Sequence, residues 1–426
     1  MASTTQAPPA TRPPTPTDEP SRSGLAARVF LGRVFAPVPS EFLLIASTAL
    51  LLTGFGLVMV LSATSATATA AGEPPYEAVI KQAVFAVIGI PLMFVASRMP
   101  VRFWKRIAWP ALIGAVLFQL LVFVPGLGVE ANGNRNWVQI AGLQFQPAEF
   151  LKITLALWIG YVLFRKQTLL GLWRHVFIPL VPMSILVIAT VMAGHDMGTA
   201  MILALVVLGA LFFSGVKLRI FILPLIGAAI GAFLFAVNSP DRMRRILSFL
   251  NPNCLADYFN DCYQPLHGIW GLAGGGLFGL GLGNSKEKYD WLPAAANDYI
   301  FAIVGEELGL IGCAVVLALF ALFAIGAFHV IRKTDDPFVR IVSGAITAWI
   351  VGQALINIGV VLRVFPVLGV PLPFMSQGGT SLLSVLLASG VLLAFARTLP
   401  EAEAKRRAAI QQAAIRRERA AARAGR

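Results

Sequence analysis

The residue with the clearest capacity for chemistry is Asp298. It ends a long, glycine-rich polar segment, 239–298, and precedes an apolar run that carries Glu306 and Glu307. Ionisable side chains at membrane depth are costly to bury and usually mark a pathway or a reaction site. As a general base, Asp298 would need a hydroxyl within reach and a partly desolvated setting that raises its pKa. As an N-cap it would begin the next helix, and one residue can do both.

A second charged motif precedes and enters the fourth apolar run. Glu149 and Lys152 are three residues apart and therefore share one helix face. They either form an ion pair that locks the helix, or line a charged cavity in which Lys152 faces an anionic ligand. Gln146 comes just before them. Arg135 and Trp137 lie in the preceding connection, where such residues also act as interfacial anchors.

Further polar groups lie beside the other outward connections. Arg242, Arg244 and Arg245 follow the seventh run, and guanidinium groups either bind phosphate oxygens in a bidentate manner or reach toward lipid headgroups. Lys288 is another cation of the same segment. Asp196, in the short turn between the fifth and sixth runs, either caps the next helix or orients a cation or substrate.

Proline and glycine interrupt the start of the last apolar run, and Ser376 and Gln377 lie in this break. Irregular backbone at membrane depth is tolerated only against protein or a water-filled cavity. Free N–H groups and hydroxyls at such a helix start can receive an anionic group. The alternative is an ordinary proline and glycine turn.

The elements that must position these residues are membrane helices. Of the 426 residues, 57% are hydrophobic and 13% are charged, whereas soluble domains are nearer a quarter charged. We therefore expect an all-α, polytopic membrane protein with about ten transmembrane helices, each of roughly 20 residues. The ten apolar runs are 42–62, 79–98, 104–124, 147–164, 176–194, 198–215, 219–237, 299–329, 338–364 and 376–397.

The placement of the net charge of +13 sets the expected orientation. Lysine and arginine gather in both tails and in every second connection, as the positive-inside rule requires. The pattern predicts a disordered cytoplasmic tail (1–40), a membrane domain (41–399) with a large extracytoplasmic loop (238–298), and a basic cytoplasmic tail (400–426). The basic tails suit contact with anionic membrane lipid, and nucleic acid is not expected as a partner.

Two cysteines, Cys254 and Cys262, lie eight positions apart in the predicted outward loop. In an oxidising exterior they would pair and staple the loop, and the alternative is two unpaired thiols.

Several motifs, in their order along the chain, resemble the SEDS family of bacterial cell-wall proteins, the FtsW and RodA group, with a closer likeness to FtsW. The resemblance covers all ten runs and leaves out both tails. The motifs are Asn-Gly-x-Arg-x-Trp (132–137), Gln-Pro-Ala-Glu-x-x-Lys (146–152), Asp-x-Gly-Thr (196–199), Gly-Gly-Leu-Phe-Gly-x-Gly-Leu-Gly (275–283), Asp-Tyr-Ile-Phe-Ala-Ile-Val-Gly-Glu-Glu-Leu-Gly (298–309) and Gly-Val-Pro-Leu-Pro-Phe-Met-Ser (369–376). The chain departs from the family at Gln377, where tyrosine is usual, and at Glu287, where glutamine is usual.

The resemblance implies a peptidoglycan glycosyltransferase of the bacterial cytoplasmic membrane that polymerises lipid II into glycan strands. It also implies a class B penicillin-binding protein as transpeptidase partner, together with other division or elongation proteins. Asp298 occupies the position of the family's essential aspartate. A divalent cation, Mg²⁺ or Mn²⁺, is implied as well, with no ligands identified.

The residues fit this reaction. The acceptor hydroxyl needs a base, for which Asp298 is the candidate, and the diphosphate leaving group needs cations. One base and a stabilised leaving group suffice for a single inverting displacement. The candidate substrate-binding residues are Arg135, Trp137, Gln146, Glu149, Lys152, Asp196, Arg242, Arg244, Arg245, Lys288, Glu306, Ser376 and Gln377.

Two other functions are compatible with the same residues. The protein could carry lipid II across the bilayer, since Gln353, Asn357 and Glu149 place polar groups within the apolar runs. It could instead serve as a scaffold for a partner transpeptidase. The first predicts flipping without polymer, and the second predicts that Asp298→Asn complements a deletion strain.

The predicted sidedness can be tested through the two loop cysteines. After reduction, Cys254 and Cys262 should react with a membrane-impermeant thiol reagent added to intact cells from which any outer envelope has been removed. Labelling only after the membrane is permeabilised would place the loop in the cytosol and exclude an outward site.

Overall fold

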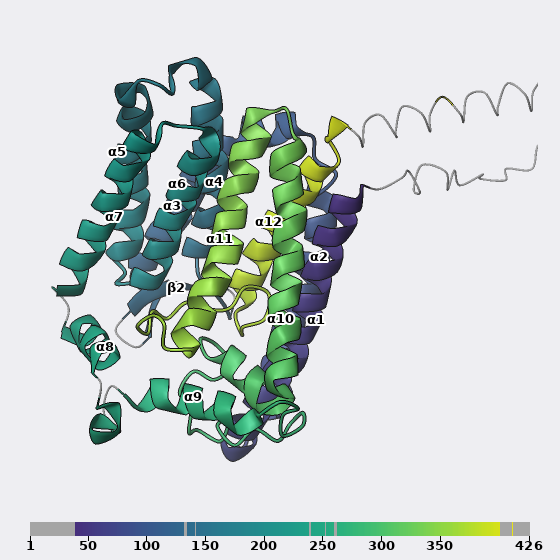
Figure 1. Cartoon of the computed structure of the whole chain (residues 1–426), viewed down its shortest axis with the longest axis vertical. Helices are drawn as coiled ribbons and strands as arrows, with labels where there is room; N and C mark the ends of the chain where they lie inside the picture. Colours follow the sequence, from purple (N-terminus) through teal and green to yellow (C-terminus); the bar gives the residue numbers. More distant parts are fainter. Residues whose placement is uncertain are drawn as a thin grey trace, which may run out of the picture. The chain divides into compact units, whose positions relative to one another are not determined.

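The computed structural model describes residues 39–131, 134–140, 142–237, 240–251, 253–259, 262–400 and Gln411. The predicted tails therefore lie almost wholly outside the described residues. Within them, one long helix corresponds to each of the ten apolar runs (Figure 1). These helices are α1 (Ser40–Ala70), α2 (Glu77–Ala96), α3 (Val101–Leu120), α4 (Ala148–Arg165), α5 (Trp173–Met192), α6 (Met197–Ser214), α7 (Leu218–Val237), α10 (Ile300–Lys333), α11 (Pro337–Val361) and α12 (Gly379–Ala396).

Eight helices of the described part are long and apolar enough to cross a membrane, which confirms a helical, multi-pass membrane protein. The other two of the ten have identifiable differences. α4 carries three charged side chains in 18 residues, Glu149, Lys152 and Arg165. α7 contains the apolar stretch Phe221–Gly231, and several of its side chains lie outside the described residues.

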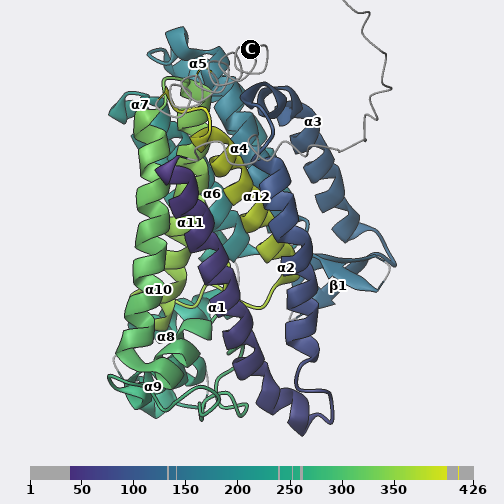
Figure 2. The same cartoon turned by 90° about the vertical axis from the view of Figure 1, so that its right-hand side faces the viewer.

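The most enclosed helices are α11 and α12, while α2, α3 and α5 expose most of their surface. α11 packs mainly against α6, α12 against α2, and α1 against α10. Figure 2 shows α1 running alongside α10. The core of the bundle is thus built around α11 and α12, the helices on either side of the connection 362–378.

The start of α1 and the ends of α10 and α12 meet at one end of the bundle. Lys333 contacts Glu41 at 3.0 Å, and the Arg397 guanidinium lies 4.4 Å from the ring centroid of Phe42. The connection between α10 and α11 lies at the same end, where it is joined to the start of α3. Several of the connections that the sequence analysis found to be basic therefore gather at one end.

A small antiparallel sheet interrupts the helical fold, and the sequence did not predict it. It consists of β1 (Gly128–Ala131), β2 (Asn134–Ile140) and β3 (Leu143–Phe145), in the order β1-β2-β3. Val129 pairs with Trp137, and Val138 pairs with Phe145. The Phe145 ring contacts that of Phe85 on α2, so the sheet is fastened to the bundle by an aromatic edge contact.

The segment predicted as one long loop contains helices. They are α8 (Pro240–Leu250), α9 (Tyr263–Gly275) and the short 3-10 helix η4 (Cys254–Asp257). Two further 3-10 turns, η2 (Leu121–Phe123) and η3 (Gln167–Leu169), follow α3 and α4. A disulfide joins Cys254 to Cys262, whose Cα atoms are 5.6 Å apart, and so links η4 to the start of α9.

The glycine-rich stretch after α9 packs its backbone against a break in α10. Gly309 has φ 66° and interrupts the helix there. The amides of Leu280 and Gly281 donate to the carbonyls of Glu306 and Glu307, each at 2.9 Å. Since a Cβ on Gly279 would overlap the carbonyl of Glu307, glycine is required for this close approach. Backbone amides of the glycine-rich stretch and backbone carbonyls near the break in α10 are thereby paired with each other, as is required of buried backbone in a membrane protein.

Candidate active site

Asp298 lies in the connection just before α10 and is partly exposed. The N-cap position of α10 is Tyr299, with no side-chain cap, so capping of this helix, one of the two roles left open for Asp298, is not observed. Burial raises the pKa of Asp298 to about 6; the nearby charge of Asp196 raises it further, while Arg245 lowers it. A carboxyl group with such a pKa can accept a proton at neutral pH and hold it better than an ordinary aspartate.

Three consecutive carbonyls fix the backbone that carries Asp298. The carbonyl of Ala296 accepts from the Gln377 amide at 2.9 Å, and that of Asn297 accepts from the Ser376 hydroxyl at 2.6 Å. The carbonyl of Asp298 itself accepts from the Asn357 side chain at 2.7 Å. The α11–α12 connection and α11 therefore hold the acid in place from two directions.

Gln82 on α2 anchors the same connection from the other side. Its amide nitrogen donates to the Ser376 carbonyl at 3.1 Å, and its oxygen accepts from the Gly378 amide at 3.0 Å. Ser376 Oγ also accepts from the Leu372 amide at 2.8 Å. Ser376 and Gln377, predicted to bind substrate, are thus engaged in positioning the Asp298 backbone, and Gln82 was missed because a single glutamine in an apolar run carries no distinctive pattern.

Two arginines lie near the Asp298–Tyr299 segment, Arg245 close enough to act on Asp298 and Arg363 close enough to act on Tyr299. Arg245 on α8 acts on the pKa of Asp298, and Arg245 and Arg363 both line a narrow crevice with Pro366. Arg363 also lies near the disulfide, with Nη2 3.3 Å from Cys254 Sγ. Arg363 was not among the predicted site residues, although it is a cation at the end of an apolar helix. Arg244 is exposed on α8, and the side chain of Arg242 lies outside the described residues.

Asp196 is the N-cap of α6, one of the two roles that the sequence left open. Its carboxyl oxygens accept from the Thr199 amide at 2.9 Å and the Thr199 hydroxyl at 2.8 Å. The Gln146 side chain donates to the same group at 3.0 Å. Burial raises the pKa of Asp196. Asp196 therefore caps α6, and its charge also raises the pKa of Asp298.

Glu149 and Lys152 form the ion pair that the sequence allowed. Lys152 Nζ lies 2.8 Å from Glu149, and both side chains are almost completely buried. Lys152 also donates to Gln353 at 3.3 Å, and Ser384 donates to Glu149 at 3.0 Å. Trp349 completes the cluster by donating to Gln353. In this arrangement Lys152 faces protein groups, so the geometry lends no support to its contact with an anionic ligand.

A second buried cluster holds the turn 283–288 and includes two more predicted site residues. Lys288 Nζ donates to the Gly283 carbonyl at 2.6 Å and lies 3.3 Å from Glu307. Glu307 also accepts from Ser62 on α1 at 2.6 Å. With side chains only 2% and 0% exposed, Lys288 and Glu307 are buried anchors, and Lys288 is not presented to a substrate in this structure.

Glu306 anchors the same turn from the neighbouring position. It accepts from the Lys286 amide at 2.8 Å and from the Ser285 hydroxyl in a short contact. Glu306 and Glu307 are both buried and contact the same turn, where Ser285 donates its hydroxyl to Glu306 and its amide to Glu307. Two adjacent acids on an apolar helix thus both find polar surroundings. The contacts of Glu306 hold the turn, so its observed role is structural.

Arg135 and Trp137 lie on β2. The Arg135 amide donates to the Gly194 carbonyl at 3.0 Å, which joins the sheet to the turn before Asp196. Both side chains are partly exposed. Asn132 and Gly133, the first residues of their motif, lie outside the described residues.

A buried histidine, His267, pairs with Glu287 of the 283–288 turn, and the sequence did not predict this contact. His267 Nδ1 is 2.5 Å from Glu287, and Tyr258 contacts the other ring nitrogen at 2.8 Å. The described residues contain no group of three His, Cys, Asp or Glu side chains suited to a metal ion.

Comparisons with known proteins show which proteins the chain is similar to. The family model FTSW_RODA_SPOVE, described as "Cell cycle protein", matches residues 42–400. A "Probable peptidoglycan glycosyltransferase FtsW" of Mycobacterium tuberculosis is 38% identical over 369 residues, covering 87% of this chain and 70% of the relative. A protein of the same name from Geobacter metallireducens is 37% identical over 352 residues, covering 82% and 93%.

Solved structures show the same fold. A chain described under "Structural coordination of polymerization and crosslinking by a peptidoglycan synthase complex" superposes with a TM-score of 0.66 at 23% identity, over 83% of this chain and 96% of that one. The rod shape determining protein RodA of Thermus thermophilus superposes with a TM-score of 0.61 at 23% identity, over the same shares.

The anchoring role of Lys288 gives a stability prediction. Lys288→Met leaves the Glu307 carboxyl group buried without its cation, and such a loss costs about 3–5 kcal/mol in soluble proteins. Unfolding in detergent should therefore occur at a clearly lower temperature. Lys286→Met is the matched control, because Lys286 is exposed two positions away. Equal unfolding temperatures for the two variants would contradict an anchoring role.

Proposed function

The chain belongs to the FtsW/RodA/SpoVE family, and we propose that it polymerises lipid II into glycan strands at the outer face of the cytoplasmic membrane. It is a peptidoglycan glycosyltransferase of cell-wall synthesis, the activity named for its relatives from Mycobacterium and Geobacter. The observation that carries the finer proposal is Asp298 itself: the backbone that carries it is held by three hydrogen bonds, its side chain is partly exposed, its pKa is raised, and Arg245 is near.

In the proposed reaction, Asp298 accepts the proton of the acceptor sugar's hydroxyl. The oxygen then attacks the anomeric carbon of the donor, the bond from that carbon to the diphosphate oxygen breaks, and undecaprenyl diphosphate leaves. Attack opposite to the leaving group inverts the configuration. Because Asp298 is held through its backbone carbonyl, the segment that carries its side chain stays fixed, and no residue of the described part is shown bonding to its carboxyl oxygens.

Arg245 and Arg363 are the cations that we assign to the diphosphate. Negative charge grows on the leaving group in the transition state, and guanidinium groups bind phosphate oxygens in a planar, bidentate manner. Both line one narrow crevice, and Arg245 is also close enough to Asp298 to lower its pKa. Arg244 and Arg242 on the same helix are further candidates. Lys152 and Lys288 drop out of this role because buried protein groups engage them.

The proposed orientation rests on charge. Basic connections gather at the end of the bundle where Lys333 and Arg397 approach the start of α1. The positive-inside rule assigns that end, and with it both termini, to the cytoplasm. Asp298 then faces outward, where nucleotide sugars are absent and the donor must arrive already activated on a lipid.

A class B penicillin-binding protein is the proposed partner, with other division proteins. A polymerase that works outside the cell needs a crosslinking enzyme close to its product. One structural neighbour is described as coordinating polymerization and crosslinking within a peptidoglycan synthase complex, which supports the proposal without identifying the partner of this chain. A divalent cation is a further proposal. The roles assigned above to Asp298, Arg245 and Arg363 are roles of the protein's own side chains.

Transport of lipid II receives less support. The polar groups that could line a path, Gln353, Asn357 and Glu149, are each engaged in hydrogen bonds inside the bundle. Such groups would have to exchange these partners for a passing headgroup, at the cost of leaving buried polar atoms unpaired. We therefore favour the enzyme.

Asp298→Asn separates these functions. In proteoliposomes with labelled lipid II and the partner transpeptidase, the variant should insert normally but lose at least about 99% of polymerisation, the scale expected for removal of a general base. Asp290→Asn is the matched control, as Asp290 is exposed on the same segment and its φ of 61° is one that asparagine adopts readily. Full polymerisation by Asp298→Asn would exclude Asp298 as the base, and lipid flipping without polymer in the wild type would favour transport.

A further inference from the structure

A pocket at the opposite end of the bundle has no role in the reaction described above. It has a volume of about 440 Å³ and lies where three connections converge. Gln167 and Gly171 come from the α4–α5 connection, Ser214 from the end of α6, and Arg340 from the first turns of α11. Asp336, just before the lining residue Pro337, pairs with Lys105 at 2.7 Å, so the pocket belongs to the end that carries the basic connections.

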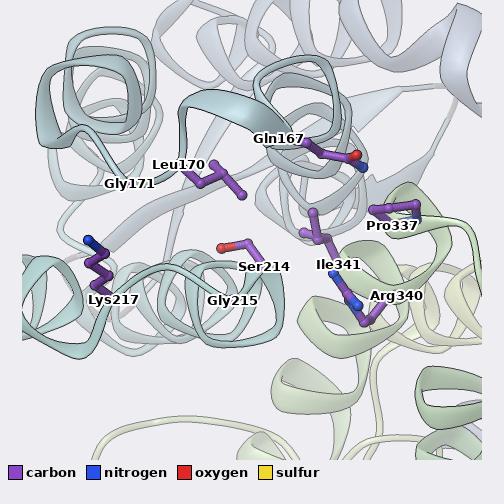
Figure 3. A pocket seen from close by; sticks show the side chains of 9 residues that line it. All are labelled: Gln167, Leu170, Gly171, Ser214, Gly215, Lys217, Pro337, Arg340 and Ile341. Carbon is purple, nitrogen blue, oxygen red and sulfur yellow. The ribbon is translucent and has the colours of Figure 1, made fainter.

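The lining is cationic. Figure 3 shows Lys217 and Arg340 on opposite sides of the pocket, with the Ser214 hydroxyl between them. None of the nine lining residues is acidic. The nearest acid along α11, Asp336, has its carboxyl oxygens occupied by Lys105 and by the Phe338 amide at the helix N-cap. The pocket therefore holds positive charge that its own lining does not neutralise.

Arg340 gives the second observation. Its Nε is buried, yet it has no hydrogen-bond partner among the described residues. A buried N–H of a charged group without a partner is costly, and structures normally provide one. The oxygens of the lining side chains Gln167 and Ser214 are neutral and neither bonds to this Nε, so a ligand with anionic oxygens is the chemistry that would complete the site.

We propose that this pocket binds the phosphodiester headgroup of an anionic membrane lipid. The source is argued from the surroundings. The same α4–α5 connection exposes Leu169 and Leu172, and α5 begins with the exposed Trp173; these apolar side chains suit the boundary between headgroups and acyl chains. A soluble phosphate would gain nothing from these residues, whereas a lipid would place its headgroup on Arg340 and Lys217 and its chains beside them.

Titration of the purified full-length protein by native mass spectrometry tests the proposal. A short-chain phosphatidylglycerol should bind at least about tenfold more tightly than a phosphatidylcholine of equal chain length, because only the former keeps its net negative charge. Arg340→Gln should weaken phosphatidylglycerol binding about tenfold. Arg332→Gln, which removes an exposed arginine at the same end of the bundle, should leave it unchanged.

A second variant keeps the test independent of charge. A Cβ on Gly171 would meet no atom within 4 Å, so Gly171→Phe can fill the pocket without a backbone clash. It should weaken phosphatidylglycerol binding as Arg340→Gln does. Equal binding of both lipids, or equal loss in Arg332→Gln and Arg340→Gln, would overturn the pocket. Inorganic phosphate binding as tightly as phosphatidylglycerol would overturn the lipid assignment.

Discussion

The fold depends on one constraint: where the backbone departs from helical structure inside the bundle, its N–H and C=O groups need hydrogen-bond partners from the protein. Water cannot satisfy backbone in the apolar interior, so irregular segments persist only where other segments pair with them. The break in α10 at Gly309 is paired with the glycine-rich stretch after α9, and the segment before Asp298 is paired with the connection before α12. The site is a by-product of this mutual pairing, since the same hydrogen bonds fix the reactive acid.

The constraint also divides the charged residues into two groups. Deep in the bundle, Lys152 forms an ion pair with Glu149, and Lys288 forms one with Glu307. Buried pairs of this kind specify an arrangement more than they stabilise it. Asp298, Arg245 and Arg363 lie at the surface of the same framework, where burial is incomplete and a substrate can approach. The buried pairs hold the turns, and the outer groups remain available for chemistry.

The sequence predicts the frame of this molecule better than its site. All ten helices follow from apolar runs, because a run of about 20 apolar residues has few alternatives to a membrane helix. The sheet 128–145 and the helices within 239–298 depend on contacts with distant segments and leave no such pattern. Asp298 was identified through its place beside an apolar run, whereas Gln82 and Arg363 were not, since their importance comes from neighbours about 300 and 65 residues away. For the same reason the sequence did not show that Lys152 and Lys288 are paired with buried glutamates, and both were predicted to bind substrate.

The pH dependence of polymerisation tests the central claim, that a pinned and partly desolvated Asp298 is the proton acceptor. Its pKa of about 6 means that the carboxylate form prevails above pH 6 and is lost as the pH falls through that value. The rate with saturating lipid II should therefore decline on acidification with a midpoint near 6, and Arg245→Gln should move the midpoint upward, because Arg245 lowers this pKa. A rate that stays constant down to about pH 4, the range of an ordinary aspartate, would contradict the account.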